Sequence, residues 1–281
     1  MAAPGGPDTG GGGAIWQSGQ AMAIDGNRFY FTTGNGFGGP GELTTQPRNG
    51  KIPISTLQQA IASFRVDPTT GRLTPSDYFV PHDFEALNRI DSDIGSSGVT
   101  LLDRNAFKKN GVPRLALAGG KRGNVFVMNA DNLGGFKNGP GGQDGVLQVI
   151  KAPKGLYGGA SSYPVEGPYV YLPSPKAPIT VFKWDSGAGN FTQVAESPGE
   201  LGGRGGAVIT SLDGKPGTGV VWVSDLNRGL VAFKAVPVNG KLVEIPLPKT
   251  LPVTKYQRPT FGNARVYTVS GNTLIAVGRP G

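Results

Sequence analysis

The side chains that can carry acid–base chemistry are few, and they gather in one loop. His82 is the single histidine of this 281-residue chain; Asp83 follows it directly, and Asp91 and Asp93 lie in the same loop. A histidine and a carboxylate can exchange protons with a substrate when both line one pocket. His82 and Asp91 are therefore the catalytic candidates, although a single histidine in a loop is more often an ordinary loop residue.

The same loop carries two alternating carboxylates. Asp91 and Asp93 flank Ser92, and carboxylate oxygens at such spacing are ligands that calcium accepts. A calcium loop of the EF-hand type would continue with further ligands and a glutamate, which do not follow here. Asp-Ser-Asp also forms turns in which the side chains accept backbone hydrogen bonds. We prefer the turn and keep Asp91 and Asp93 as the metal-site alternative.

Other catalytic signatures are missing from the sequence. The absence of cysteine excludes disulfides, thiolate metal sites and cysteine nucleophiles, and one histidine excludes multi-histidine zinc sites. No serine lies in a nucleophile-elbow pentapeptide. The glycine-rich residues 34–39 follow a strand pattern but open no helix and include no lysine, so we expect no nucleotide loop there.

The elements that must position these residues are short strands. A strand–turn–strand phrase returns about five times, and the later copies lie about 45 to 55 residues apart, the length of one four-stranded propeller blade with a loop. The clearest copies begin at Arg28, Leu115, Tyr169, Val220 and Arg265. The 47 glycines and 24 prolines fall between the apolar runs, as tight turns require. We expect an all-β propeller of about five four-stranded antiparallel blades.

The ends of the repeat series look incomplete. The last copy has no outer strand after Val277, and the glycine- and proline-rich residues 1–13 run directly into a strand pattern. We expect one propeller domain over residues 1–281. Its blades fit a small closed ring or part of a ring of seven or eight blades with N-terminal blades missing, and the incomplete ends favour the second.

The charge balance is basic but dispersed. The net charge is +8, with a pI near 9.7, and only two pairs of adjacent basic residues occur, Lys108-Lys109 and Lys121-Arg122. Nucleic-acid binding depends on clustered phosphate contacts, so we expect no nucleic-acid partner. No apolar run approaches the roughly 18 residues of a membrane span. A small anionic ligand or a polysaccharide remains open.

Three groups of residues resemble the quinoprotein-like propellers, the pyrroloquinoline-quinone repeat superfamily, and in particular its secreted fungal and bacterial members. They are residues 12–19, residues 77–81 with 88–95, and residues 118–127. The similarity extends over nearly the whole chain, and blade motifs specify fold better than activity. The resemblance implies a protein of the cell surface or the extracellular space.

The quinone enzymes of that superfamily hold their cofactor with two adjacent cysteines, a stacking tryptophan and a bound calcium ion. This chain has no cysteine, so it cannot form that cysteine ring. The tryptophan-docking phrase is partial as well, because residues 63–73 keep its aspartate, threonine and glycine without a following tryptophan. Both departures argue against pyrroloquinoline quinone with calcium, and we expect no cofactor.

The binding site should lie where the chain leads into each innermost strand. These lead-in segments consist of residues that are small or can form hydrogen bonds. In a propeller they would converge on the central channel. They are residues 17–19, 95–98, 159–162, 202–206 and 257–259. Loops between second and third strands would add basic residues to the same face. The predicted ligand-binding residues are Gln17, Ser97, Lys121, Arg122, Ser162, Arg204, Arg228 and Arg258.

Together these residues predict a polar, net-positive funnel suited to an anionic or polyhydroxyl ligand. The strongest candidates for binding an anionic ligand are Arg204, Arg228 and Arg258, because a guanidinium binds a carboxylate through two parallel hydrogen bonds. The plainer alternative is that the small residues only let inner strands approach while the arginines are solvated. We predict a secreted or cell-surface, non-catalytic ligand-binding or scaffold module for a small polar or anionic ligand, such as a saccharide. The alternative is an enzyme, either a diverged quinone-dependent alcohol or sugar dehydrogenase or a carbohydrate lyase or hydrolase using His82, Asp91 and Arg204.

Overall fold

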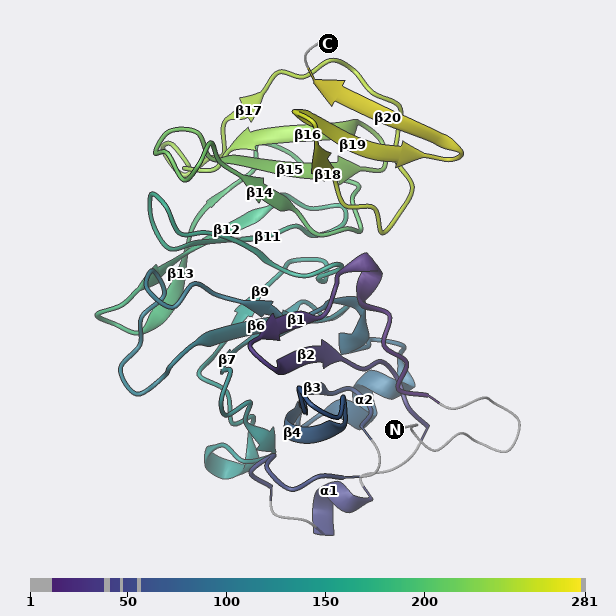
Figure 1. Ribbon diagram of the computed structural model, residues 1–281, viewed down its shortest axis with the longest axis vertical. Helices are drawn as coiled ribbons and strands as arrows, with labels where there is room; N and C mark the ends of the chain where they lie inside the picture. Colours follow the sequence, from purple (N-terminus) through teal and green to yellow (C-terminus); the bar gives the residue numbers. More distant parts are fainter. Residues whose placement is uncertain (1–11, 38–40, 46–47, 55–56, 279–281) are drawn as a thin grey trace.

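The computed structural model describes residues 12–37, 41–45, 48–54 and 57–278, and within them the protein is built almost entirely of β-strands. Five antiparallel sheets follow one another in chain order, from the purple first sheet to the yellow last one (Figure 1). Each sheet pairs its strands in sequence order, with the first strand at one edge. This arrangement confirms the predicted all-β propeller with multiple four-stranded blades.

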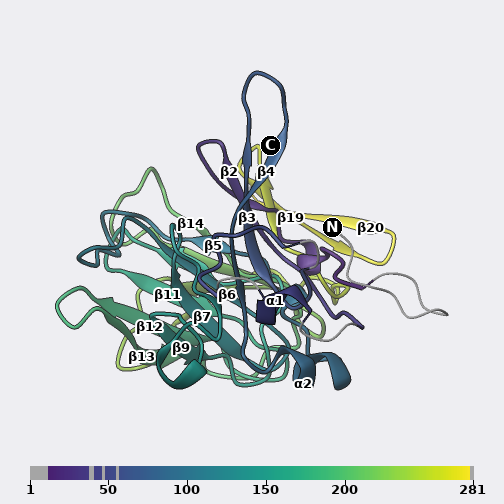
Figure 2. The same cartoon turned by 90° about the horizontal axis from the view of Figure 1, so that it is seen from below.

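The first two blades contain the longest connections. Blade 1 consists of β1 (Ala23–Asp25), β2 (Arg28–Thr32), β3 (Ile61–Val66) and β4 (Leu73–Val80). Blade 2 consists of β5 (Thr100–Leu101), β6 (Leu115–Gly119), β7 (Asn124–Asn129) and β9 (Gln148–Lys151). A short strand, β8 (Gly135–Phe136), leaves blade 2 and pairs in parallel with β4, so it ties the first two blades together. The exposed turn between β3 and β4 projects from the blade (Figure 2).

The last three blades are more regular. Blade 3 consists of β10 (Ser161–Tyr163), β11 (Tyr169–Leu172), β12 (Thr180–Asp185) and β13 (Asn190–Glu196). Blade 4 consists of β14 (Val208–Thr210), β15 (Val220–Asp225), β16 (Gly229–Lys234) and β17 (Glu244–Ile245). Blade 5 consists of β18 (Thr260–Gly262), β19 (Arg265–Ser270) and β20 (Thr273–Gly278), without an outer strand in the described part of the chain.

Helical structure is confined to the connections. Two short α-helices are described, α1 (Glu42–Thr45) and α2 (Phe84–Arg89). Three 3₁₀ turns accompany them: η1 (Gln17–Gly19), η2 (Ile94–Ser96) and η3 (Pro140–Gly142). No helix among the described residues combines the length and the apolar character that crossing a membrane requires.

The hydrophobic core lies between neighbouring blades. Phe79 of β4 and Phe126 of β7 place their ring centroids 4.8 Å apart at the interface of blades 1 and 2. Because successive side chains of a strand point to opposite faces, β12 directs Phe182 towards blade 2 and Val181 towards blade 4. Each inner blade therefore buries both faces only through its two neighbours.

The two end blades each keep a face without such a neighbour. Ile24 of β1 is 70% exposed and Leu274 of β20 is 67% exposed, although both are large apolar side chains in strands. Blade 5 lies at one end of the long axis of the molecule in Figure 1, and most of blade 1 lies in the opposite half. Among the described residues, none of the buried hydrophobic clusters joins blade 1 to blade 5.

Packing between blades predicts where substitutions destabilise the protein. Leu117 is fully buried between blades 2 and 3, so Leu117→Ala should lower the free energy of unfolding by about 2–5 kcal/mol. Leu274→Ala removes the same atoms from an exposed position and should cost less than about 0.5 kcal/mol. Urea denaturation of both variants measures the difference, and equal losses would contradict the packing described here.

Candidate functional site

The lead-in segments of all five blades meet at the hub. The Gly158 amide donates to the Ser96 carbonyl over 3.0 Å, which joins the segments of blades 3 and 2. A Cβ atom on Gly206 would lie only 2.4 Å from the Gly158 carbonyl oxygen, so glycine is required where blades 4 and 3 touch. We call these backbone contacts between lead-in segments the crossing. They determine which side chains of neighbouring blades lie close to one another.

Three aromatic side chains stand beside this crossing. Trp16 and Tyr256 meet edge to face with centroids 5.7 Å apart, and Tyr157 stacks beside Tyr256 at 6.5 Å. The three rings precede the innermost strands of blades 1, 3 and 5, and each is half-buried. We call Trp16, Tyr157 and Tyr256 the aromatic platform. It is one continuous patch contributed by segments that are far apart in sequence.

Each ring of the platform lies beneath a cation. The Lys121 ammonium is 5.6 Å from the centroid of Trp16, the Arg204 guanidinium carbon is 5.3 Å from that of Tyr157, and the Lys255 ammonium is 5.3 Å from that of Tyr256. Cations at these distances are attracted by the negative face of the ring. Burial raises the pKa of the Tyr157 hydroxyl, although the charges of Arg204 and Lys121 oppose that rise.

Lys121 is also the centre of an ion-pair cluster. Its ammonium lies 2.8 Å from Asp91 Oδ1 and 3.0 Å from Asp93 Oδ1, while Asp93 Oδ2 accepts the Trp16 Nε1–H over 3.0 Å. Burial would lower the pKa of Lys121, but the two carboxylates outweigh it and the net pKa is raised. The hydrogen bond from Lys121 is the main cause that lowers the pKa of Asp91. This cluster holds Trp16 and Lys121 in position.

The same contacts bear on the calcium alternative at Asp91 and Asp93. The Lys121 ammonium lies between the two carboxylates and supplies the positive charge that a metal ion would supply. Within the part of the chain that the structure describes, histidine and acidic side chains form no group of three or more suited to a metal. The donor set of Asp91 and Asp93 therefore does not fit a calcium ion.

Arg204 and Lys255 differ from Lys121 in their pairing. Both are exposed, and among the described residues neither lies within 4.0 Å of a carboxylate. Arg122 and Arg228, in contrast, form exposed ion pairs with Asp83 and Glu244. The platform therefore carries two exposed cations, Arg204 and Lys255, that no described carboxylate neutralises.

Two predicted ligand-binding residues are buried and support the backbone. Gln17 accepts the Thr32 amide over 3.0 Å, and its side-chain amide donates to the Gln20 carbonyl. The Ser97 hydroxyl accepts the Gly119 amide over 3.3 Å and donates to the Gly98 carbonyl over 3.0 Å. These contacts occupy both side chains with the shaping of the lead-in segments.

His82 finds a partner that the sequence does not indicate. Its Nδ1 lies 3.1 Å from Asp144 Oδ1, and the same oxygen accepts the His82 backbone amide over 2.7 Å. Asp91 instead contacts Lys121 and Asn35. The two catalytic candidates thus belong to different contact networks.

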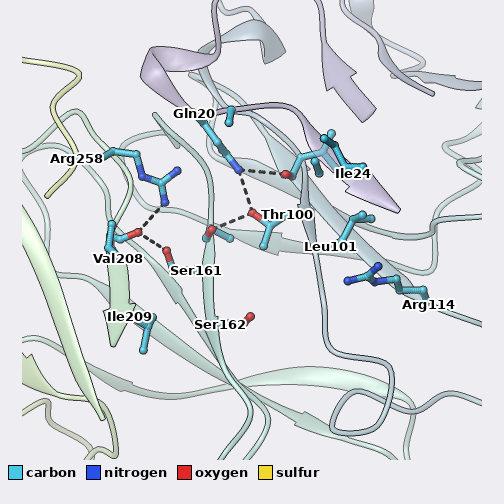
Figure 3. A pocket seen from close by; sticks show the side chains of 15 residues that line it. Gln20, Ile24, Thr100, Leu101, Arg114, Ser161, Ser162, Val208, Ile209 and Arg258 are labelled. Carbon is cyan, nitrogen blue, oxygen red and sulfur yellow. Dashed lines mark hydrogen bonds between the residues drawn. The ribbon is translucent and has the colours of Figure 1, made fainter. Parts of the chain in front are cut away.

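Arg258 and Ser162 lie inside the hub and line the cavity shown in Figure 3. Arg258 donates from Nη1 to the Gly158 carbonyl over 3.2 Å and from Nη2 to the Ala207 carbonyl over 2.7 Å. We call this cavity the hub cavity. The residues of the predicted funnel are therefore divided between two places: Lys121 and Arg204 lie over the platform, and Ser162 and Arg258 line the hub cavity.

Sequence reasoning did not identify the aromatic platform. It gave no role in ligand binding to Trp16, Tyr157, Tyr256 or Lys255. A signal was nonetheless present, because an aromatic residue stands within two positions of the lead-in segment in Trp16-Gln17, Tyr157-Gly158-Gly159 and Tyr256-Gln257. An aromatic residue at this position before three of the five blades indicates that the three rings lie on one surface.

No protein-family model and no curated protein sequence matches this chain. Solved structures do match. A candidate 6-phosphogluconolactonase from Bacteroides uniformis is 16% identical with a TM-score of 0.55, over 92% of this chain and 66% of that one. The quinohemoprotein alcohol dehydrogenase ADHIIG of Pseudomonas putida HK5 is 14% identical with a TM-score of 0.56, over 95% of this chain and 46% of that one.

A second candidate 6-phosphogluconolactonase, from Bacteroides fragilis, is 15% identical with a TM-score of 0.50, over 87% of this chain and 57% of that one. The chain thus spans less than two thirds of the length of each structure named here. At these identities the likeness establishes the propeller fold alone. It does not distinguish a secreted or fungal type.

The ion-pair cluster predicts a specific change in titration. The pKa of Asp91 is lower in the folded protein than in the unfolded chain. Its ion pair with Lys121 therefore stabilises the protein fully when the pH is above the pKa of the unfolded chain. This stabilisation is lost as the pH falls through the pKa of the folded protein. Lys121→Met should raise the pKa of Asp91 towards its ordinary value. Carbon-detected NMR titration of the carboxyl group measures this. Lys108→Met, which alters an exposed lysine, should leave the Asp91 midpoint unchanged, and an unchanged midpoint in Lys121→Met would contradict the pairing.

Proposed function

We propose that this protein is a non-catalytic, ligand-binding propeller module whose aromatic platform takes an anionic carbohydrate. The observation that carries the proposal is the gathering of three half-buried rings, each beneath a cation, where the lead-in segments of separate blades meet. An extracellular or cell-surface setting, where acidic polysaccharides are accessible, completes the proposal.

The chemistry of the platform favours a sugar acid. An aromatic ring offers a flat apolar face, and the C–H face of a pyranose ring can cover it while the hydroxyl groups stay at the wet edges. Arg204 and Lys255 add exposed positive charge at the same place without a carboxylate partner among the described residues. A guanidinium can bind a carboxylate through two parallel hydrogen bonds. A uronate presents both features in one residue.

The residues that could perform acid–base chemistry support a binding role. His82 contacts Asp144, whereas Asp91 is paired with Lys121 beside the platform. The raised pKa of Lys121 keeps that amine protonated at neutral pH, so it does not act as a base there. The proposal takes binding rather than turnover because His82 and Asp91 contact different partners and do not form an acid–base pair with each other.

Calorimetric titration with a defined oligogalacturonate tests the proposal. Arg204→Ala removes a charge-assisted hydrogen-bond donor and should weaken binding at least tenfold, about 1.4 kcal/mol. Tyr157→Ala removes a ring face and should weaken binding by about two- to tenfold. Binding should also weaken as salt is added, because the charges are exposed.

Arg228→Ala is the matched control, since Arg228 is an exposed arginine that pairs with Glu244. It should bind the oligogalacturonate as the unaltered protein does. The fully methyl-esterified oligomer, which lacks the carboxylates, should bind at least tenfold more weakly. Equal affinities for Arg204→Ala and the unaltered protein would remove the proposal, and release of shortened chains would replace it with the lyase or hydrolase alternative.

A further inference from the structure

The hub cavity is a concave region whose lining includes no residue of the platform. It has a volume of about 460 Å³ and is lined by the innermost strands of blades 1 to 4 together with Arg258 (Figure 3). Each of these strands is the first of its sheet and pairs along one edge only. Alternate backbone N–H groups on the free edges therefore remain available inside the hub.

Side chains fill the passage between the cavity and the platform. Gln20 donates from Nε2 to the Val99 carbonyl over 3.0 Å and accepts the Gly98 amide over 2.9 Å. Arg258 bridges the lead-in segments of blades 3 and 4 through its bonds to Gly158 and Ala207. A ligand on the platform and a ligand in the cavity would consequently be held by different groups.

The cavity is positively charged. Arg258 and Arg114 line it, in the view of Figure 3 on opposite sides, and none of the residues lining it is acidic. Arg114 is neutralised from outside the lining by Asp25, whose carboxylate lies 3.2 Å away. Arg258 has no carboxylate within 4.0 Å in the described part of the chain.

The Arg258 guanidinium, which has no carboxylate partner among the described residues and is partly removed from water, lowers the stability of the folded protein. Burial lowers the pKa of Arg258 below its ordinary value, yet an arginine remains charged at neutral pH. Removing a charge from water costs free energy unless an opposite charge compensates for it. The guanidinium has five N–H donors and uses two on carbonyl groups, which leaves three for a ligand.

Hydroxyl groups extend this donor set. Ser162 is half-buried and lies among the lining side chains (Figure 3). Thr100 and Ser161 also line the cavity, but each hydroxyl already donates to a backbone carbonyl, of Ala160 and Ala207. Of these three hydroxyls, that of Ser162 is therefore the one left to donate to a ligand in the cavity.

We propose that the hub cavity is a second binding site, specific for a small oxyanion, with Arg258 as its charged group and Ser162 and free strand-edge amides as further donors. The oxyanion is a carboxylate or a phosphate group; both have the charge and the acceptor oxygens that this set requires. The site is independent of the platform, so either proposal can fail alone.

Inorganic phosphate and acetate are the probes, titrated separately at constant ionic strength by calorimetry and by thermal unfolding. A ligand that binds only the folded protein raises the melting temperature with its concentration. Arg258→Gln should weaken binding of the preferred probe at least about 30-fold, as expected when one partner of a buried charge pair is removed. The probe that binds more tightly identifies phosphate or carboxylate as the natural group.

Ser162→Leu gives a second route that leaves Arg258 in place, because its larger side chain fills the cavity. It should abolish the rise in melting temperature even if Arg258→Gln does not fold. Arg228→Ala, which alters an exposed arginine outside the cavity and the platform, should bind both probes as the unaltered protein does. The proposal is overturned if neither probe binds in the millimolar range, if Ser162→Leu binds them unchanged, or if Arg258→Gln folds and binds them unchanged.

Discussion

Everything at the hub depends on the close approach of backbones where the blades begin. Gly158 and Gly206 touch without side chains between them, and the Gly158 amide bonds directly to the carbonyl of Ser96. This dense crossing brings residues adjacent to it into contact although they are 99 or more positions apart in sequence. Trp16, Tyr157 and Tyr256 meet beside the crossing because each precedes a lead-in segment by one or two positions.

Charge is distributed around this crossing according to burial. Lys121, partly buried, is matched by two carboxylates that also orient Trp16. Arg204 and Lys255, exposed over the outer rings, are matched by none within the described residues and can remain hydrated until a ligand arrives. Arg258, inside the hub, relies on two carbonyl groups. Basic side chains around the hub thus have three different environments: an ion pair for Lys121, solvent for Arg204 and Lys255, and backbone carbonyl groups for Arg258.

The repeat of apolar doublets was sufficient to predict the propeller, its turns and the unfinished last blade, because strand alternation and turn chemistry are local properties. β8 was not predicted, since its pairing with β4 depends on two residue pairs that are each 56 positions apart in sequence. The candidate site was predicted in part. Lys121 and Arg204 lie at the platform, whereas the pairing of His82 with Asp144 depends on a loop packing that no local pattern encodes.

The gap between the end blades gives the platform a mechanical role. Trp16 belongs to the first blade and Tyr256 to the last, so their edge-to-face contact spans the opening of the ring at its inner rim. Pulling the two ends apart would separate these rings, and a molecule lying across both would resist that movement as a clasp does. The segments that lead into the first and last blades thus meet through this ring pair and through the close approach of Gly19 to the Tyr256 carbonyl, so a molecule on these rings touches both ends of the arc.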